Sequence, residues 1–517
     1  MSALKEALDA CIESLMKDGT PKCDFLPWRT QVLHECERRL STRSAWSSKK
    51  IVVSSAARKY LRFLQHHLVL VPVDKAANNI AFVCKKLYCQ LLTNELSNPQ
   101  GAYVSVQKKV ELILAEHKQY LESKKFEVKD QLAYLYWLPK LHKNPVGQRF
   151  IAGSAVCSTT DLSKVLSDVL NLVLKTLLEK DDECALETGV RRFFVVTTYE
   201  EVASSLSQQM PISHNCQLRT GDFSTMYTTI PHDDLLARIQ QVTQEAWEWA
   251  ARREAVPLCD VVVRWTSSET QWARKARGRF LDAKFCHTLT HSHLNDLVSF
   301  LVKNIYLVNG GECKRQSLGI PMGTNCAPAL ANLYMYSYES EFIDRQNSDV
   351  ATAFRHTYRL IDDVLSVGNP FWEKAVGVSA EAGGMYPSCL QLNDTSISPS
   401  SVNFLGMQIL LRRGRIVLDV FDKRKEFKFL VNRYPHMDSL IPESIPYGVF
   451  SGLVHRFYRI CSEKEAFVRQ CRELASVLVA QGCAVKRIRN EFRRALRKLW
   501  PVKWNTPVWK LFRAFSL

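Results

Sequence analysis

The chain has 517 residues, 46% of them hydrophobic and 23% charged, a composition typical of a folded protein with two to four subdomains. Its 69 Lys and Arg against 52 Asp and Glu give a net charge of +17, which favours a polyanionic partner, nucleic acid before an anionic membrane surface. The 16 cysteines show neither a CxxC pair nor a regular framework, which argues against a disulfide-stapled secreted domain. With no apolar stretch long enough to span a bilayer, we expect a soluble, intracellular and nuclear protein without a membrane partner.

Residues 1–68 are expected to form a helical N-terminal extension. The opening MSALKEALDACIESLMKDG has apolar residues at helical spacing and is too charged for a signal peptide. The β-branched run LVLVPVDK ends this part, and a mixed region continues to about residue 210. Within that region, WLPKLHKNPVGQRFIAGS has the pattern of a strand, a turn and a second strand, and it carries several cations.

The sequence QLRTGDFSTMYTTIPHDDL, residues 217–235, predicts a strand, a turn and a helix that begins near Pro231. The next segment, about residues 236–296, mixes tryptophans with many Arg and Lys residues, and helix is expected from there to residue 308. This mixture suits contact with nucleic acid, and a helical insert that packs on the core fits nearly as well. The segment also holds four residues that zinc could bind, namely Cys286, His287, His291 and His293. Their close spacing and the lack of a second ligand pair speak against a zinc site.

The C-terminal half begins with NGG at residues 309–311, which predicts a hairpin turn. The sequence GIPMGTNCAPALANLYMYSYESEFI then predicts a glycine-bearing turn and a helix with an apolar stripe. YRLIDDVLSV, residues 358–367, predicts a β-hairpin with two aspartates at or near its turn, and VNFLGMQIL predicts another strand. The last ~90 residues are expected to be helical and basic.

Two adjacent aspartates, Asp362 and Asp363, stand in the otherwise apolar hairpin YRLIDDVLSV. An Asp-Asp pair alone is usually a solvated turn, but apolar neighbours on both sides make that explanation poor here. A third acid, Asp222, ends the strand in TGDFSTMY. If the strands are neighbours in one sheet, the three carboxylates converge and can hold two divalent cations, which removes the repulsion between them.

The ordered motifs DFSTMY, QSLGIPMGTNCAPALANLYMYSYE, RLIDDVL and NFLGMQI resemble motifs A, B, C and E of reverse transcriptases. Together with WLPKLHKNPVGQRFIAGS and IPYGVFSGLVHRFYRIC, they resemble the Penelope-like retroelement enzymes, the branch nearest telomerase, from about residue 70 to 495. The resemblance implies an α+β right-hand polymerase fold with fingers, palm and thumb, in which an antiparallel palm sheet carries the catalytic hairpin. The expected bounds are 1–68 for the extension, 69–210 for the fingers, 211–420 for the palm and 421–517 for the thumb.

The resemblance also implies a role for particular residues. Asp222, Asp362 and Asp363 would be the catalytic acids that bind two Mg²⁺ ions, with Mn²⁺ a possible substitute, and the Phe223 carbonyl would be open to the second metal. Tyr227 would exclude a ribose 2′-hydroxyl, although an ordinary core tyrosine is the simpler alternative.

Other residues are assigned to the nucleotide and to the nucleic acid on the same basis. The residues expected to bind the nucleotide are Lys75, Lys140, Arg149, Tyr227 and Gly323, of which Lys75 is about as well explained as a surface lysine. The residues expected to bind the primer or the duplex are Phe404, Leu405, Gly406, Arg489, Arg493 and Arg494. From residue 484 to the last residue, ten Lys and Arg face one Glu, a local charge of +9 that suits a duplex backbone.

The sequence departs from the usual pattern in two places. Leu360 stands two residues before the aspartate pair, where most reverse transcriptases have Tyr and telomerases have Leu. The motif D region offers Asn393 and Asp394 and lacks the lysine that protonates pyrophosphate in some polymerases, which leaves the proton donor open, with water as one candidate.

We expect an RNA-directed DNA polymerase of a retroelement without its own endonuclease, since no such segment is recognised after the thumb. Its partners would be an RNA template, a DNA primer, the RNA–DNA duplex and deoxynucleoside triphosphates. A telomerase-like enzyme is the alternative within this class. A catalytically silent, domesticated nucleic-acid-binding relative is the alternative outside it.

Overall fold

The computed structural model describes residues 54–208, 216–275, 286–429, 431–434, 436–439, 441–499, 503–504 and 507–515, together with residues 9, 27 and 29–34. The chain divides into two compact units. One comprises Met1–Leu61 with Asp438–Pro442, and the other Arg62–Met437 with Glu443–Leu517. The amphipathic helix expected at the N-terminus lies almost entirely outside the described residues. Helix α3 (Ser55–His67) agrees with the helical prediction for the end of the extension.

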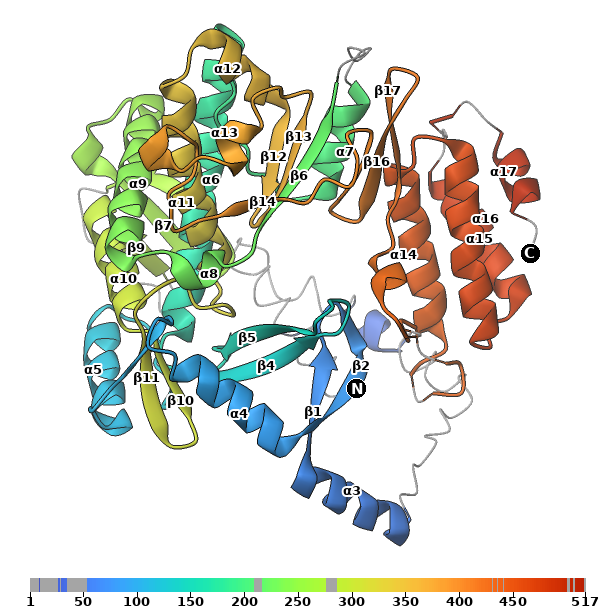
Figure 1. Ribbon diagram of the computed structural model, residues 1–517, viewed down its shortest axis with the longest axis horizontal. Coiled ribbons are helices and arrows are strands. Elements are labelled where there is room, and N and C mark those ends of the chain that lie inside the picture. The colour runs from blue at the N-terminus through green and yellow to red at the C-terminus, as the bar shows by residue number, and fades with distance from the viewer. Residues whose placement is uncertain are drawn as a thin grey trace. The chain divides into compact units, whose positions relative to one another are not determined.

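A four-stranded antiparallel sheet lies at the centre of the larger unit, with the strand order β12-β13-β6-β14 (Figure 1). Its strands are β6 (Leu218–Phe223), β12 (Thr357–Leu360), β13 (Asp363–Val367) and β14 (Leu392–Asp394). Strand β13 buries Val364, Leu365 and Val367, because both faces of the sheet are covered. The predicted strand ending at Asp222 and the predicted Asp-Asp hairpin are therefore neighbours in one sheet.

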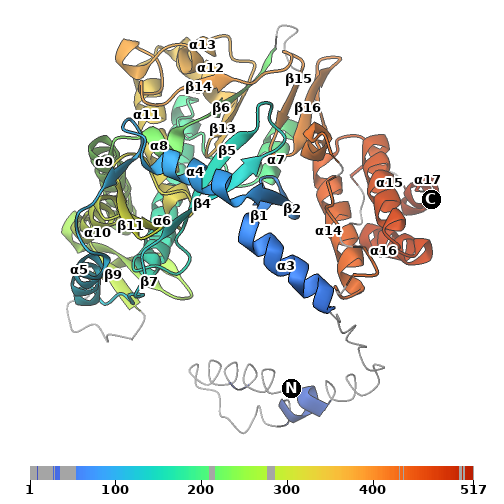
Figure 2. The same ribbon diagram turned by 60° about the horizontal axis from the view of Figure 1, so that its bottom comes forward.

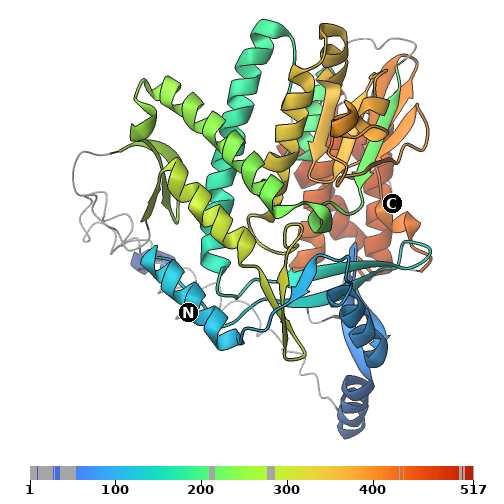
Figure 3. The ribbon, with the colours of Figure 1, turned by 60° about the vertical axis from the view of Figure 1, so that its left-hand side comes forward.

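Three long helices form the main core beside this sheet: α6 (Thr160–Thr188), α9 (His232–Glu254) and α11 (Ala327–Asp344). Helix α11 is buried on almost every side, as expected of a helix that is apolar all round. Figure 3 shows α6 as the long teal helix that runs through this layer. The helix predicted after Pro231 begins at His232, and the one predicted after the glycine turn begins at Ala327.

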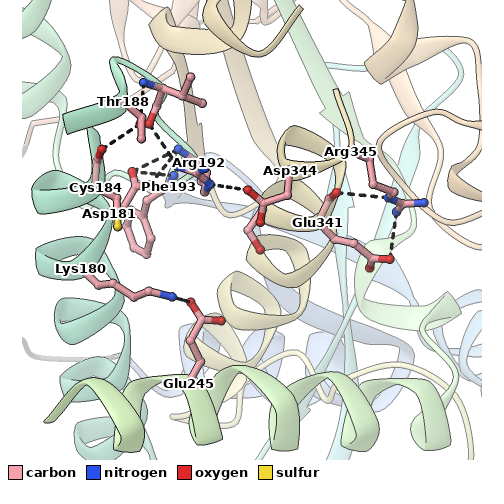
Figure 4. A network of polar contacts seen from close by, with 12 residues as sticks. Lys180, Asp181, Cys184, Thr188, Arg192, Phe193, Glu245, Glu341, Asp344 and Arg345 are labelled. Carbon is pink, nitrogen blue, oxygen red and sulfur yellow. Dashed lines mark hydrogen bonds and ion pairs between the residues drawn. The ribbon is translucent and has the colours of Figure 1, made fainter. Parts of the chain in front are cut away.

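Charged side chains of the same three helices belong to the network of polar contacts shown in Figure 4. Lys180 of α6 pairs with Glu245 of α9 at 2.5 Å, and Arg345 pairs with Glu341 of α11 at 3.1 Å. The buried carboxylate of Asp181 accepts hydrogen bonds from two backbone N–H groups just after α6. These pairs surround a cavity of about 520 Å³.

In the described part of the chain, two β-hairpins precede α6. The first pairs β1 (Leu68–Val73) with β2 (Ala76–Cys84), and the second pairs β4 (Tyr134–Lys140) with β5 (Gly147–Gly153). The second hairpin confirms the strand, turn and strand predicted for WLPKLHKNPVGQRFIAGS. The remaining elements before α6 are α4 (Lys85–Leu96), β3 (Tyr103–Ser105) and α5 (Val110–Ser123).

The segment predicted as an insertion packs on the core. Trp247 of α9 is buried, and the indole N–H of Trp272 donates to Thr176 of α6 at 2.8 Å, so the tryptophans serve packing. The expectation of helix through residue 308 is wrong, because α10 ends at Lys303 and the next residues pair as a hairpin around Gly310 and Gly311. The elements here are β7 (Val261–Thr266), β8 (Thr270–Arg274), β9 (Cys286–Leu289), α10 (His291–Lys303), β10 (Tyr306–Asn309) and β11 (Glu312–Gln316).

The single strand predicted for VNFLGMQIL is in fact two strands. β15 (Ser401–Phe404) and β16 (Met407–Arg412) are joined by a two-residue turn at Leu405 and Gly406, both of which have positive φ. β17 (Arg415–Val420) completes this second sheet. Helix α7 (Tyr199–Gln208) contacts β17, whereas α12 (Ser348–Ala353) contacts α11 and α13 (Glu373–Val376) contacts β14.

The C-terminal helices have a hydrophobic core of their own, and Figure 2 shows them side by side. They are α14 (Ser444–Ile460), α15 (Lys464–Ala480), α16 (Val485–Lys498) and α17 (Val508–Ala514). Helix α16 buries one apolar stripe and exposes its Lys and Arg side chains, in agreement with the predicted basic helix. No helix among the described residues has the length and apolarity that crossing a bilayer requires.

Candidate active site

The central sheet brings the three predicted acids together. Asp363 lies directly opposite Asp222 in the register between β13 and β6. The backbone N–H of Phe223 donates to the Asp362 carbonyl at 3.1 Å, so the turn of the hairpin is tied to the end of β6. The structure thus places all three aspartates at the same end of β6 and β13, although Asp222 precedes Asp362 by 140 residues in the chain.

The turn that carries Asp362 is strained. Leu360 pairs with Asp363, which leaves only Ile361 and Asp362 in the turn. Ile361 has a φ of +56°, a backbone conformation that favours glycine and is costly for a β-branched residue. A residue in such a strained backbone conformation persists only when contacts with the surrounding structure keep it there.

The carboxylates repel one another. Desolvation, followed by the Asp362 and Asp222 charges, raises the pKa of Asp363 to about 6. Desolvation also raises the pKa of Asp362, while Lys75 and Arg149 act in the opposite direction. Carboxylates in this state gain from a divalent cation placed between them.

The donor set suits a metal ion that takes part of its ligands from the substrate. No group of three or more His, Cys, Asp or Glu side chains closes around a single metal position in the described part of the chain. Two aspartates face each other across a strand pair, and the third lies in the adjoining turn. Mg²⁺ commonly takes few carboxylates and completes its shell with waters and substrate phosphates.

The candidate zinc ligands serve other contacts. The ring of His287 stacks on Phe126 at 4.3 Å, and His291 hydrogen-bonds to Thr243 at 2.9 Å. Burial lowers the pKa of both histidines. Packing thus engages both histidine rings, and the absence of a zinc site stays a prediction.

The cations predicted to bind the nucleotide lie on the two hairpins near the aspartates. Lys75 is in the β1–β2 turn with a φ of +63°, and Arg149 lies on β5. Burial lowers the pKa of Lys140, and the charges of Arg149 and Lys143 lower it further. The charges of Asp74 and Asp222 act in the opposite direction. Lys140 therefore lies in a group of cations, and the charge of Asp222 acts on it as well.

Asp74 was missed by the sequence analysis. Its carboxylate, 6% exposed, forms an ion pair with Arg149 at 2.9 Å. The second carboxylate oxygen of Asp74 and the Nε of Arg149 are buried without a partner within the described structure. The pair joins the two hairpins and fixes the direction of the Arg149 guanidinium. The only sequence signal was an acid beside Lys75 in the β-branched run.

Tyr227 and the glycine-bearing turn are in contact. The N–H of Ile320 donates to the Tyr227 carbonyl at 2.9 Å, and a Cβ at Gly319 would lie 2.1 Å from that oxygen. Gly319 has a φ of +81°, so glycine is required there for both space and backbone conformation. Burial, followed by the Asp362 charge, raises the pKa of the half-buried Tyr227 hydroxyl. Tyr227 therefore lies between the turn and the acids.

Gly323 is packed against the β4–β5 hairpin. It has a φ of +119°, and a Cβ there would lie 2.2 Å from the Ala152 carbonyl. The neighbouring Met322 carbonyl accepts from the Ala152 N–H at 2.7 Å, and the Gly323 carbonyl accepts from the Ser154 hydroxyl at 2.7 Å. The lack of a side chain at Gly323 therefore allows the backbone of β5 to pack closely against this turn.

The residues assigned to the nucleic acid have different surroundings. Phe404 is buried in the core shared by the two sheets, whereas Leu405 and Gly406 form the turn itself. Arg489, Arg493 and Arg494 are exposed on α16, where Arg494 pairs with Glu491 at 3.1 Å. These residues thus belong to the second sheet and to a C-terminal helix, whereas the aspartates belong to the central sheet.

Asn393 of the motif D region lies beside the acids. It is opposite Asp222 in the pairing of β14 with β6, and its amide donates to Ser224 at 3.1 Å. Asp394 is directed elsewhere and accepts from the indole of Trp372 at 2.9 Å.

The segment between β17 and α14, which we call the linker, is hydrogen-bonded to the β1–β2 hairpin. The Asn79 side chain exchanges two hydrogen bonds with the backbone of Asn432, at 2.9 and 3.1 Å. The Asn78 amide donates to the Arg433 carbonyl at 2.7 Å. We call these contacts the linker clasp. No sequence pattern indicates the linker clasp, because its partners are more than 350 residues apart.

The fold is similar to that of a telomerase of known structure. Telomerase from Candida albicans, solved with a fragment of telomeric RNA, superposes with a TM-score of 0.53 at 10% identity, over 88% of this chain and 71% of that one. Apo telomerase from Candida tropicalis gives 0.46 at 11% identity, over 87% and 72%. The RNA-dependent RNA polymerase of a human picobirnavirus gives 0.39 at 12% identity, over 94% and 88%.

No model of a protein family matches the sequence, and no curated protein matches it. The similarity to the Candida albicans telomerase establishes the fold, a mixed arrangement of helices and antiparallel sheet found in a nucleic-acid polymerase. The mixed α+β class predicted from the sequence is confirmed by this fold. The division into fingers, palm and thumb, and the assignment to the Penelope-like branch, stay predictions.

Proposed function

We propose that this protein is an RNA-directed DNA polymerase that extends a primer 3′-hydroxyl by two-metal nucleotidyl transfer. The observation that carries the proposal is the pairing of Asp363 with Asp222 beside the strained turn at Asp362. A carboxylate set at a sheet edge, on a polymerase fold, is the arrangement needed to hold two cations at the reacting phosphate.

In this proposal Asp222, Asp362 and Asp363 hold two Mg²⁺ ions, or Mn²⁺ in their place, with the Phe223 carbonyl as a further ligand. When bound, the ions activate the attacking hydroxyl and neutralise the leaving pyrophosphate. The deprotonated carboxylates are the form that binds, so the raised pKa of Asp363 sets a lower pH limit on this step.

The cations of the two hairpins bind the triphosphate. Arg149, oriented by Asp74, offers a planar fork to two phosphate oxygens, and Lys140 and Lys75 add point charges. Tyr227, held by the turn at Gly319, lies where a ribose 2′-hydroxyl would meet its ring, which favours deoxynucleotides. With Asn393 at the motif D position, the side chain offers no acid, and water protonates the pyrophosphate.

The basic face of α16 and the turn at Leu405 and Gly406 hold the RNA–DNA duplex and its primer strand. Contacts with the duplex backbone give affinity without base preference. We place the enzyme in the nucleus, as that of a retroelement. A telomerase-like enzyme is the second candidate, favoured by Leu360 and by the fold shared with the Candida albicans telomerase.

A primer-extension assay tests the proposal. Purified protein should extend a DNA primer on an RNA template only with Mg²⁺ or Mn²⁺, and less well on a DNA template. Asp362→Asn should abolish extension, whereas Asp130→Asn, at an exposed loop aspartate, should leave it unchanged. Extension by Asp362→Asn at the normal rate would end the assignment. Extension by neither protein, with nucleic-acid binding intact, would support the silent relative instead.

A further inference from the structure

A fully buried ion pair lies directly behind the catalytic hairpin. Arg359, on β12, and Glu339, on α11, are both 0% exposed. Two parallel hydrogen bonds join them, from Nε to Oε1 at 2.5 Å and from Nη2 to Oε2 at 3.0 Å. This bidentate geometry is the strongest that Arg can form with a carboxylate.

Neighbouring groups satisfy the rest of the pair. Arg359 Nη1 donates to the Asn332 side-chain oxygen at 2.8 Å, and Nη2 donates to the Asn332 carbonyl at 3.2 Å. The buried Tyr386 hydroxyl donates to Glu339 Oε1 at 2.9 Å. The network therefore joins β12 to two different elements of the core, helix α11 and the segment that contains Tyr386.

One further bond reaches the strained turn. Arg359 Nη1 also donates to the carbonyl of Ile361, at 3.3 Å, the residue with positive φ next to Asp362. The Arg359 backbone is fixed as well, because its N–H donates to Phe194 at 2.7 Å and its carbonyl accepts from Val196 at 2.9 Å. The guanidinium is thus a rigid support against which the turn rests.

Fold stability alone does not call for charges at this place. Burying two ions carries a large desolvation penalty, and well-packed apolar residues of similar volume often replace such pairs without loss of stability. An apolar residue cannot, however, donate to the Ile361 carbonyl. The hydrogen bond to the turn is therefore the property that an ion pair supplies and an apolar pair does not.

We propose that Arg359 is a positioning residue that holds the Ile361 carbonyl and, through it, the orientation of the Asp362 carboxylate toward a divalent cation. Glu339, Asn332 and Tyr386 fix the guanidinium in turn. This inference rests on the proposed function, since it assigns a support to the metal-binding edge of that site. The alternative is that the network only joins β12 to α11.

The decisive variant is the double substitution Arg359→Met with Glu339→Leu, which removes both charges together. The matched control is Arg238→Met with Glu341→Leu, which removes an ion pair between α9 and the same helix α11. Glu341 belongs to the network shown in Figure 4. Apart from their own pair, Arg238 pairs with Asp234 on α9, and Glu341 pairs with Arg345 at the end of α11. Three readouts are compared in the full chain: the melting temperature, Mn²⁺ affinity by electron paramagnetic resonance without nucleic acid, and primer-extension kinetics.

We call the double substitution Arg359→Met with Glu339→Leu the hairpin variant. We expect it to melt near the wild type and to bind Mn²⁺ about 10-fold more weakly. Its kcat should fall by a larger factor than its KM for the nucleotide changes. The control should keep Mn²⁺ affinity and kcat. Tyr386→Phe, which loses one bond to Glu339 and no charge, should weaken Mn²⁺ binding by about 2–3-fold, so a double variant that fails to fold does not decide the matter.

Unchanged Mn²⁺ affinity in the folded double variant, or in Tyr386→Phe if the double variant does not fold, would show a purely structural network. Asp362→Asn separates this outcome from a failure of the proposed function. If Asp362→Asn also leaves Mn²⁺ affinity unchanged, the metal site itself is wrong. If Asp362→Asn weakens Mn²⁺ binding and the hairpin variant does not, only the role of Arg359 is refuted.

Discussion

Replacing Gly319 with Ala should damage the site through one oxygen atom. A Cβ at this position would lie 2.1 Å from the Tyr227 carbonyl, which already accepts from Ile320 at 2.9 Å. Real contacts of this kind need more than 3 Å, so the Tyr227 turn has to move by about 1 Å. Gly311 offers a matched control, because its φ of +88° resembles the +81° of Gly319 and no atom lies within 4 Å of its Cβ position.

The magnitudes follow from these geometries. A left-handed conformation costs an Ala about 1–2 kcal/mol at either position. At Gly319 the overlap adds about 1–3 kcal/mol, and loss of the Ile320 hydrogen bond adds about 1 kcal/mol. We therefore expect the free energy of unfolding to fall by about 3–6 kcal/mol in Gly319→Ala and by about 1–2 kcal/mol in Gly311→Ala.

Urea denaturation followed by tryptophan fluorescence measures both losses. Primer extension with deoxy- and ribonucleotides measures the effect on Tyr227, whose displacement should raise KM for the nucleotide and weaken sugar discrimination. Gly311→Ala should retain both kinetic properties. Equal losses of stability in the two variants would refute the reasoning, because the overlap at Tyr227 would then contribute nothing.

Three more predictions concern the charges. Asp74→Asn should raise KM for the nucleotide about 10-fold, since Arg149 loses its partner, and an unchanged KM in steady-state kinetics would contradict this. Because the pKa of Asp363 is raised to about 6, the folded apo protein binds more protons than the unfolded chain between about pH 4 and 6. Without divalent cations its stability should fall as the pH rises through this window, an effect that Asp363→Asn should remove in thermal melts. Arg497→Gln on α16 should lower the salt dependence of duplex binding by about one counterion, as fluorescence anisotropy at several salt concentrations can show.

The acids were predictable because their signal is local. Asp222 ends an apolar strand and the Asp-Asp pair interrupts another, so the sheet topology had only to make the two strands neighbours. The turn at Leu405 was not predictable from the same kind of pattern. A non-glycine residue with positive φ leaves no mark in a sequence, and a single glycine does not by itself end a strand, so VNFLGMQIL looked like one strand.

The supporting residues were missed for another reason. Asp74 is 75 residues from Arg149 in the chain, and Glu339 is 20 residues from Arg359. Single charged residues give no indication from sequence that they are buried or paired, since most charged side chains are exposed. The tryptophans of residues 236–296 left two interpretations open, and the burial of Trp247 and the hydrogen bond from Trp272 to Thr176 favour packing.

The linker clasp changes how the chain is connected as a whole. The linker leaves β17, passes Lys423, whose charge acts on Asp363, and is hydrogen-bonded at Asn432 to Asn79 near the turn that carries Lys75. The first hairpin is joined through Arg149 and β5 to the glycine-bearing turn, and so back to the sheet. Hydrogen bonds, one ion pair and the chain itself thus connect these segments one after another. Because the clasp consists of hydrogen bonds, it can open and close while the covalent path from β17 to the C-terminal helices is unchanged.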